Sequence, residues 1–549
     1  GDISLMPTYG DVELSREGLA SEYSHANEVA VPGYYRVLLD RFGIQAEMTA
    51  TKRVALYCFT YPRGSNNARI VIDLENTVGD NTKEARVAPL DEYTLVGYRR
   101  SSGWASDQHV YFCIRFNRPM HNWYSKDLNA NYGEATFELS PGDQVMAKVA
   151  LSPTSEANAI MNMNQEMPGN FDFKAVATAA NEAWETELAR IKATFRTERE
   201  KRIFYTAMYH FMVAPQIWCD VTGDYMGADL KVHRGAKYET LTTWSLWDTY
   251  RAAHPLATLI MPDRMSDYAN TMMAIYREHG ELPMWHLTSC ETYCMVGEPG
   301  IPVLADMILK GECGDINQEE AFEAMKASLL PTEYAKVRRL PLRGKDYLAD
   351  LGYLPYDGRE GETVAKNLEY YLASWAVAQV AGKLGHKEDS IRFYNLSQNY
   401  HKLWDKRVKC MRALDTKGNL RPLPEDFNPQ FQTGDYTEGN PWQYAFLVPH
   451  DVNGLAELMG GKEALDAHLD ALLNAPSDLG EHHNPDISGL IGQYAHGNEP
   501  SHHVLYMYNY VGQPRKTQMR VRQVMDELYT DQPAGLCGNE DVGQMSAWY

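Results

Sequence analysis

The sequence lacks the features of several large protein classes. Among its 549 residues, no apolar run approaches the roughly 18 residues that would suggest a membrane span. Basic residues are in deficit, because 52 Lys and Arg face 73 Asp and Glu and give a formal net charge of −21. Without a Lys/Arg cluster to offset it, this charge repels phosphate backbones, so we expect no nucleic-acid partner. Cations and neutral ligands fit the composition better.

Cysteine is sparse, and several catalytic signatures are missing. The eight cysteines are scattered, and only Cys290 and Cys294 lie at a helical spacing, which is too few ligands for a zinc site. The sequence contains no Gly-x-x-x-x-Gly-Lys loop, no Gly-x-Ser-x-Gly elbow and no His-Glu-x-x-His motif. These absences remove several large classes of nucleotide-binding proteins and hydrolases.

The chain is long enough for two domains, and its texture changes along its length. Up to about residue 152, short β-branched and aromatic segments such as 54–59, 68–73 and 109–114 alternate with turn residues. Many short strands predict a β-sandwich. We expect this domain over residues 1–155, followed by a linker with a helix over 156–197.

Residues 198–549 predict helices joined by long loops. The stretches 363–384 and 387–404 are separated only by Gly385 and His386, a break suited to an antiparallel hairpin. Repeated hairpins predict either a closed double ring of helices or an open solenoid. Long loops rich in Trp, Gly, Pro, His and acidic residues favour the ring, because such loops build a pocket.

The first loop segment that carries chemistry spans residues 242–251. Trp244 and Trp247 lie here beside Asp248 and Arg251. Aromatic rings stack on the CH-rich faces of sugars, while carboxylate and guanidinium groups bind hydroxyls, so the segment suits a sugar site. An Asp248–Arg251 pair at i,i+3 spacing, with buried Trp residues, explains the pattern equally well.

A second segment, residues 436–444, places Glu438 close to Trp442. Desolvation beside an aromatic side chain raises the pKa of a carboxyl, as a general acid near neutral pH requires. The alternative is a Glu in the first turn of a helix, where it stabilises the N-terminus.

The third segment, residues 496–503, gathers oxygen and imidazole ligands. Asn498 and Glu499 offer the oxygens that suit a hard cation such as Ca²⁺, while His502 and His503 suit sugar hydroxyls or a metal. Helix capping by Asn498 and Ser501 is the alternative.

The fourth segment, residues 535–548, places Glu540 and Asp541 between glycines before a predicted helix. Adjacent acids in such a loop can hold a water, a cation or both. A helix start rich in acids is again the alternative. Four such loops on one helical scaffold are hard to explain by capping alone.

Six strings in one order resemble glycoside hydrolase family 92, the calcium-dependent exo-α-mannosidases. They are residues 243–251, 281–285, 353–357, 438–444, 497–503 and 538–548. Residues 24–35 resemble the sandwich domain of that family, so the resemblance runs along the whole chain. It implies an N-terminal β-sandwich joined to an (α/α)6 barrel, and release of mannose from α-mannoside glycans with inversion.

The resemblance also implies roles for particular residues. Glu438 is similar to the general acid of the family and Asp541 to its general base, with Glu540 as a partner of the base. The calcium-site residues would be Asn498, Glu499 and Asp541. The substrate contacts implied are Trp244, Trp247, Asp248, Arg251, Trp285, His502 and His503.

The chain departs from the family pattern in two places. The family usually has further residues before Gly1 and after Trp548, so we expect a sandwich incomplete at its start and a barrel incomplete at its end. Some α-1,2-selective members carry a His-Glu pair where Tyr494 and Ala495 stand here, which disfavours α-1,2 linkage. The resemblance implies a secreted, periplasmic or cell-surface protein, although no signal peptide is visible in the sequence.

Two other functions fit parts of the pattern. A helical scaffold could bind a glycan or protein without cleaving it. A barrel enzyme could instead cleave mannosyl-phosphate linkages, where phosphate leaves without the help of a carboxylic acid. Glu438, rather than Gln, at the acid position argues against this second alternative.

Overall fold

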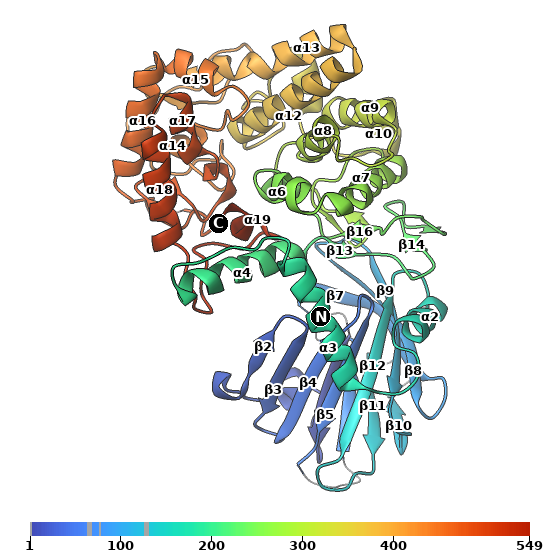
Figure 1. The fold of residues 1–549 in the computed structure, drawn as a ribbon. Coiled ribbons are helices and arrows are strands. Elements are labelled where there is room, and N and C mark those ends of the chain that lie inside the picture. The colour runs from blue at the N-terminus through green and yellow to red at the C-terminus, as the bar shows by residue number, and fades with distance from the viewer. Residues whose placement is uncertain (1–2, 63–67, 76–77, 126–130, 482) are drawn as a thin grey trace. The chain divides into compact units, whose positions relative to one another are not determined.

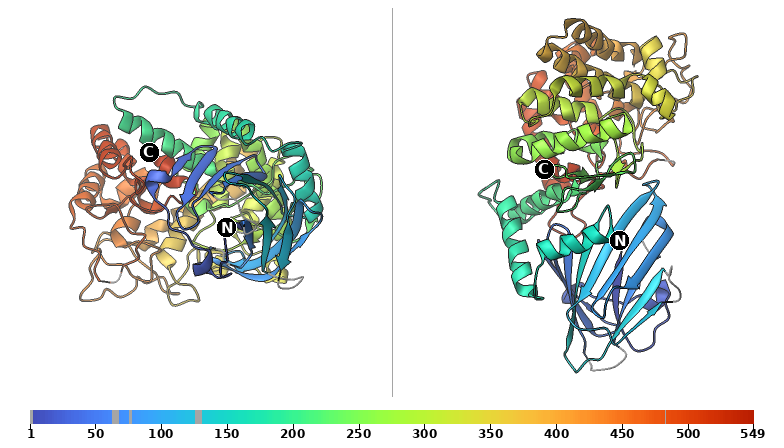
Figure 2. Two further views of the ribbon diagram at one scale, coloured as in Figure 1. Left: turned by 90° about the horizontal axis from the view of Figure 1, so that it is seen from below. Right: turned by 90° about the vertical axis from the view of Figure 1, so that its right-hand side faces the viewer.

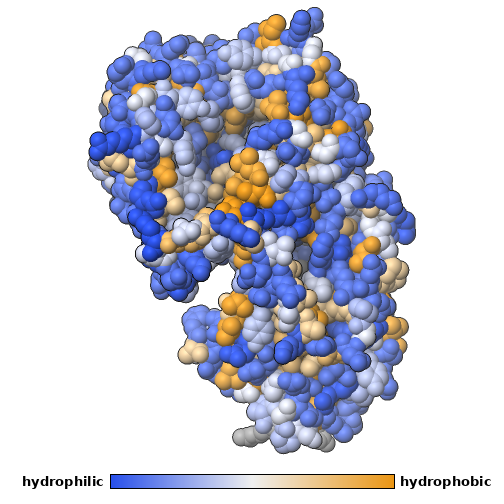
Figure 3. Space-filling view, in the orientation of Figure 1, coloured by the Kyte–Doolittle hydropathy of each residue, from blue (hydrophilic) through white to orange (hydrophobic). Residues whose placement is uncertain are grey.

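The structure is a computed structural model of residues 1–549, and it describes all of them except 1–2, 63–67, 76–77, 126–130 and 482. Within this described part, every helix is too short or too polar to cross a membrane. The face seen in Figure 3 is mostly hydrophilic, with apolar patches between the polar side chains.

The chain divides into two compact units, a β-rich one and a helical one (Figure 1). The β-rich unit consists of Gly1–Ile191, Gln216–Thr242 and Leu287–Thr292. The helical unit consists of Lys192–Pro215, Thr243–His286 and Tyr293–Tyr549.

Two antiparallel sheets form the centre of the β-rich unit (Figures 1 and 2). The larger sheet has, in spatial order, β2 (Val29–Val31), β3 (Tyr34–Leu39), β4 (Ile44–Ala50), β5 (Val54–Thr60), β12 (Gln144–Ser152), β9 (Gln108–Phe116), β8 (Thr94–Gly103) and β7 (Asp80–Pro89). The smaller sheet has β1 (Ser4–Tyr9), β6 (Ala68–Asp73), β11 (Tyr132–Phe137) and β10 (Asn122–Ser125).

The core of this unit follows the two-residue period of its strands. Phe112 and Ile114 of β9 pack with Ile70 and Ile72 of β6 in one buried cluster that draws on both sheets. Cys113 of β9 points to the opposite face, where it packs in a second cluster. The predicted sandwich is therefore confirmed, and the strands expected at 54–59, 68–73 and 109–114 are β5, β6 and β9.

Two helices follow β12 in this unit. Met163 of α2 (Glu156–Glu166) packs on Val54, Leu56 and Cys113 of the larger sheet. α3 (Phe173–Leu188) lies in the region where a linker helix is predicted. The predicted domain boundaries at residues 155 and 197 stay predictions.

The helical unit contains the four loop segments singled out from the sequence, except for Thr242. Its longer helices are α4 (Glu198–Val213), α6 (Ala253–Ile260), α7 (Met265–His279), α8 (Gly300–Lys310), α9 (Gln318–Leu329), α12 (Thr363–Leu384), α13 (Lys387–Ser397), α15 (Val452–Met459), α16 (Lys462–Asn474) and α18 (Pro514–Glu527). Shorter ones are α5 (Leu246–Thr249), α10 (Glu333–Arg338), α11 (Lys345–Leu351), α14 (Pro441–Tyr444), α17 (Met507–Tyr510) and α19 (Gln544–Trp548).

The predicted helical hairpin is α12 with α13. α12 ends at Leu384 and is capped by Gly385, whose φ of 89° is readily adopted by glycine, and α13 begins at Lys387. The predicted second stretch is α-helical only to Ser397, because a 3-10 helix continues it over Gln398–Leu403. The expected order of a β-sandwich and then a helical domain is confirmed.

Candidate active site

Three carboxylates from separate segments of the helical unit meet in one place. Asp248 lies in α5, Glu499 begins a 3-10 helix (Glu499–Ser501), and Asp541 lies in the loop before α19. One carboxylate oxygen of each lies within 4.8 Å of one oxygen of each of the others. Asp248 is 3% exposed and Glu499 0%. We call these three residues the carboxylate triad.

The triad carries more negative charge than its surroundings neutralise. Burial, and then the neighbouring carboxylates, raise the pKa values of Asp248 and Glu499 well above their usual range. Burial likewise raises the pKa of Asp541 to about 6. Neither carboxylate oxygen of Glu499 has a hydrogen-bond partner among the described residues. Such an arrangement is costly unless a proton or a cation is present.

The nearest arginine is already paired. Arg251 places its Nη2 atom 2.9 Å from Oε1 of Glu369 in α12, and both side chains are buried. Tyr250 also donates to Glu369, from 3.0 Å. Because Glu369 offsets the charge of Arg251, the guanidinium cannot neutralise three carboxylates. The donor set of the triad, carboxylate oxygens from two buried acids and the half-buried Asp541, is one that a hard divalent cation prefers.

Glu438 is not a member of the triad, although the charge of Asp541 acts on it, and it has a different environment. The side-chain amide of Asn498 donates to its main-chain carbonyl at 2.7 Å and lies 3.4 Å from its Oε2 atom. Burial, and then the charge of Asp486, raise the pKa of Glu438 to about 7, compared with its ordinary value of 4.5. Glu438 is therefore a carboxyl group that can keep its proton near neutral pH.

The loops that present these acids have unusual backbone conformations. Glu438 has a φ of 44° and Asp541 a φ of 47°, and the adjacent Val542 also lies in the left-handed region. Non-glycine residues rarely adopt such values, and strained positions of this kind gather at functional sites.

Glu540 is oriented by the helix that follows it. Its carboxylate accepts hydrogen bonds from the Ser546 backbone N–H at 3.1 Å and the Ser546 hydroxyl at 2.7 Å, and it lies 3.0 Å from Nδ1 of His210. It thus binds a donor in the first turn of α19, as the helix-start interpretation expects. The partnership of Glu540 with the base stays a prediction.

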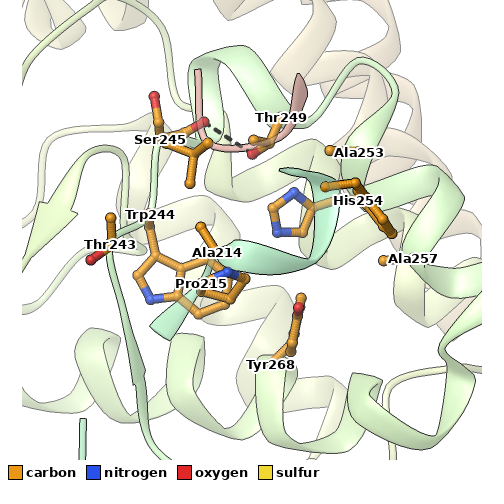
Figure 4. A pocket seen from close by; sticks show the side chains of 12 residues that line it. Ala214, Pro215, Thr243, Trp244, Ser245, Thr249, Ala253, His254, Ala257 and Tyr268 are labelled. Atoms are coloured by element: carbon orange, nitrogen blue, oxygen red, sulfur yellow. Dashed lines mark hydrogen bonds between the residues drawn. The ribbon is translucent and has the colours of Figure 1, made fainter. Parts of the chain in front are cut away.

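The three predicted tryptophan contacts are largely buried. Trp244 lines a pocket in which His254 and Tyr268 lie around its ring (Figure 4), with centroid distances of 5.8 and 5.4 Å. Trp247 is 0% exposed and packs beneath the guanidinium of Arg251. Trp285, at 9% exposed, is the most accessible of the three. Sugar stacking by these rings stays a prediction.

The two predicted histidines already have hydrogen-bond partners. His502 donates from Nε2 to the His496 carbonyl at 3.0 Å and contacts Gln544 through Nδ1. His503 donates from Nε2 to the Phe446 carbonyl at 2.7 Å. A sugar contact through either of these ring nitrogens would require exchange of an existing hydrogen bond.

Sequence reasoning missed two acids of the site. Asp486, a half-buried loop residue, raises the pKa of Glu438 and also that of Asp541, and Asn539 donates to it at 2.9 Å. Its local sequence has no distinguishing pattern. Glu369 could have been found, because a single acid among the apolar residues of 368–373 is unexpected in a buried helix.

A helical domain with a crowded acidic site, preceded by a β-sandwich, describes a class of carbohydrate-cleaving enzymes. The comparisons specify the family. The Glycosyl hydrolase family 92 N-terminal domain matches residues 1–152, and the Glycosyl hydrolase family 92 catalytic domain matches residues 158–549. The chain therefore belongs to glycoside hydrolase family 92, and it is a glycosidase.

Relatives of known structure span the whole chain. A family GH92 α-mannosidase of Bacteroides thetaiotaomicron, solved in complex with mannoimidazole, is 34% identical over 100% of this chain and 75% of its own, with a TM-score of 0.92. A family GH92 inverting mannosidase of B. thetaiotaomicron VPI-5482 is 31% identical over the same shares, with a TM-score of 0.86.

A further relative is known from sequence. An uncharacterized secreted glycosidase of Arthroderma benhamiae is 25% identical, and the match covers 98% of this chain and 70% of that protein. Together with the family match, these similarities confirm the family and the enzyme class predicted from the sequence.

Proposed function

We propose that this glycosidase is an exo-acting α-mannosidase that hydrolyses terminal α-linked mannose from glycans with inversion, assisted by Ca²⁺. The observation that carries the proposal is the carboxylate triad together with Glu438, a separate acid that can hold a proton. The names of the two solved relatives support it, since one is an α-mannosidase with bound mannoimidazole and the other an inverting mannosidase.

Glu438 is the proton donor in this mechanism. With a pKa of about 7 it is largely protonated in mildly acidic solution, so it can protonate the glycosidic oxygen as the bond to mannose breaks. The Asn498 amide holds the backbone of Glu438 in place. A positioned acid of this kind is worth about 10² to 10⁴ in rate.

Asp541 is the base. Its carboxylate takes a proton from a water molecule as that water attacks the anomeric carbon on the face opposite the leaving group. The product then has inverted configuration. Asp541 must be ionised to act as the base. Removing negative charge from its surroundings lowers its pKa and therefore favours the ionised form.

The carboxylate triad fits a calcium site. Asp248, Glu499 and Asp541 would hold the ion through their carboxylate oxygens, and those of Glu499 have no hydrogen-bond partner among the described residues. When bound, Ca²⁺ supplies positive charge that neutralises these carboxylates and polarises the hydroxyls of the sugar. Asn498, also predicted for this site, uses its side-chain oxygen to accept from the Glu499 N–H at 3.1 Å.

The names of the two solved relatives support α-mannosides as the substrate class, and the sequence resemblance to the family adds the kind of glycan. We expect α-mannoside glycans of the N-glycan or mannan type, with α-1,2 linkages disfavoured. Tyr494 and Ala495, which replace the His-Glu pair, are buried in β22 (Tyr494–Ala495), which pairs with β21 (Leu490–Ile491). Neither therefore offers an exposed side chain to a sugar. Secretion is part of the proposal, since one relative is named as a secreted glycosidase.

The test is to hydrolyse α-mannosides in the presence of Ca²⁺ and to monitor the reaction by proton NMR from the first minutes. The expected first product is β-mannose, which later mutarotates. If α-mannose formed first, the configuration would be retained, and the mechanism would need a nucleophile in place of the base. The absence of mannose release from every α-mannoside tested would favour a binding scaffold, and cleavage of mannosyl phosphate alone would favour the phosphate-releasing alternative.

A further inference from the structure

One buried glutamine links the three segments that carry the triad. Gln544, at the start of α19, is 0% exposed. Its Oε1 atom accepts hydrogen bonds from the backbone N–H groups of Ala252 and Ala253, at 3.0 Å each. Its Nε2 atom lies 2.8 Å from Nδ1 of His502. One side chain thus bonds to two distant segments of the helical unit.

The direction of each bond can be assigned. A carbonyl cannot donate, so the bond from His502 to the His496 carbonyl places the imidazole proton on Nε2. Nδ1 of the neutral ring then accepts, and Nε2 of Gln544 donates to it. The two backbone N–H groups fix the amide oxygen on the other side. All three bonds therefore need an amide at position 544 in one orientation.

Gln544 also supplies a cap that α6 lacks. The residue before this helix is Ala252, which has no side-chain acceptor for the first N–H groups. Helices usually satisfy these groups with a nearby side chain. Here the acceptor comes from Gln544, about 290 residues further along the chain, which fixes the start of α6 to α19.

Gln544 and the residues that it contacts lie close in sequence to the three carboxylates of the triad. Ala252 follows Asp248 by four residues, and His502 follows Glu499 by three. Gln544 itself follows Asp541 by three residues. We propose that Gln544 is a positioning residue that holds the three triad carboxylates together and so prepares them to bind a divalent cation. This inference rests on the proposed function, because it assumes that the triad binds Ca²⁺.

A physical reason for such a link is mutual repulsion. Three carboxylates within 4.8 Å of one another would spread apart if their segments could move. A second bond reinforces the link, since Nε1 of Trp548 donates to the His502 carbonyl at 2.9 Å. Partners that orient metal ligands from outside typically change metal affinity by about 10 to 100-fold when they are removed.

The first experiment measures calcium binding by titration calorimetry on the full chain after removal of metal with a chelator. The Gln544→Met variant, which removes both the donor and the acceptor, should bind Ca²⁺ about 10 to 100-fold more weakly than the parent. The matched control is Asn317→Ala. Asn317 caps α9 in the same way, through Oδ1 and the N–H groups of Glu319 and Glu320, and its loss should leave calcium affinity within about twofold. Calcium affinity within twofold of the parent in Gln544→Met would overturn the inference.

The second experiment does not depend on calcium. Hydrogen exchange should speed up together in residues 246–256 and 496–503 of Gln544→Met, but only around residues 317–322 in Asn317→Ala. If the parent binds no Ca²⁺, the calcium part of the proposed function fails, and the exchange pattern still decides whether Gln544 links the segments. Unchanged exchange in both segments would show that it does not.

A shorter amide keeps the test decisive if Gln544→Met does not fold. Gln544→Asn preserves the polar group but is one methylene shorter, so it cannot reach both segments at once. We expect faster exchange in at least one of the two segments and at least threefold weaker calcium binding. Parent-like values in both measurements would count against the inference.

Discussion

Glu438 and the carboxylate triad are two acidic regions of one helical unit, and they handle buried charge differently. Glu438 is a single carboxyl whose loop is held by the Asn498 amide, and burial leaves it with a pKa of about 7. In the triad, the Asp248 carboxylate accepts from the Ser245 hydroxyl, while neither carboxylate oxygen of Glu499 has a hydrogen-bond partner among the described residues. The difference suggests that a desolvated acid with a second acid, Asp486, acting on it is suited to carry a proton, whereas three crowded acids are suited to share a cation.

Removal of calcium should have the largest effect. Treatment with EDTA should abolish hydrolysis, because the ionised triad would lose the charge that offsets its repulsion. Initial rates of mannose release before chelation, after it, and after addition of excess Ca²⁺ measure the effect. Recovery with Ca²⁺ is expected, and full activity in EDTA would remove the metal from the mechanism.

Loss of Glu438, the proposed proton donor, should have the next largest effect. Glu438→Gln should lower kcat/KM by about 10² to 10⁴ for mannobiosides, whose leaving alcohol needs a proton. Aryl mannosides with activated leaving groups should lose far less. Parallel kinetics on the two substrates give the ratio, and equal losses on both would contradict the assignment of Glu438 as the acid.

Much of the fold could be predicted because it follows from local patterns. The strands at 54–59 and 109–114 alternate with the period of a sheet, and Gly385 marks the end of α12. Four loops rich in Trp, His and acids indicated where chemistry lies, and the structure brings Asp248, Glu499 and Asp541 from three of them together.

The parts that could not be predicted depend on contacts between distant segments. Nothing in residues 538–548 distinguishes Glu540, which binds Ser546, from its neighbour Asp541, which joins the triad. The pairing of Arg251 with Glu369 joins residues 118 positions apart, and sequence spacing suggested Asp248 as its partner instead. Asp486 was missed for the same reason, since only the fold brings it near Glu438.

The pH dependence of kcat/KM should show what sets the pKa of Glu438. An acid catalyst works when protonated, so kcat/KM for mannobiosides should fall as pH rises through about 7. The charge of Asp486 raises the pKa of Glu438, so Asp486→Asn should lower that pKa and move the falling limb to lower pH. Full pH–rate profiles of both proteins measure this shift. An activated aryl mannoside serves as the control, because its hydrolysis depends little on the acid, and a limb that stays in place would show that Asp486 does not act on Glu438.

The smallest effect on activity is expected from a change at Glu540, which lies outside the triad. Comparison with its neighbour Asp541 therefore tests the triad. Glu540→Gln keeps an oxygen that can accept from Ser546 but loses the charge beside His210 and the N-terminus of α19. We expect a loss of about 0.3 to 1 kcal/mol in stability, and kcat/KM within about threefold of the parent. The adjacent change Asp541→Asn should instead reduce kcat/KM by about 10² to 10⁴ with little change in thermal stability. Thermal unfolding and kinetics of the two variants, measured side by side, separate an acid that caps a helix from one that acts in catalysis. A comparable loss of activity in both variants would contradict the assignment of Asp541 alone as the base.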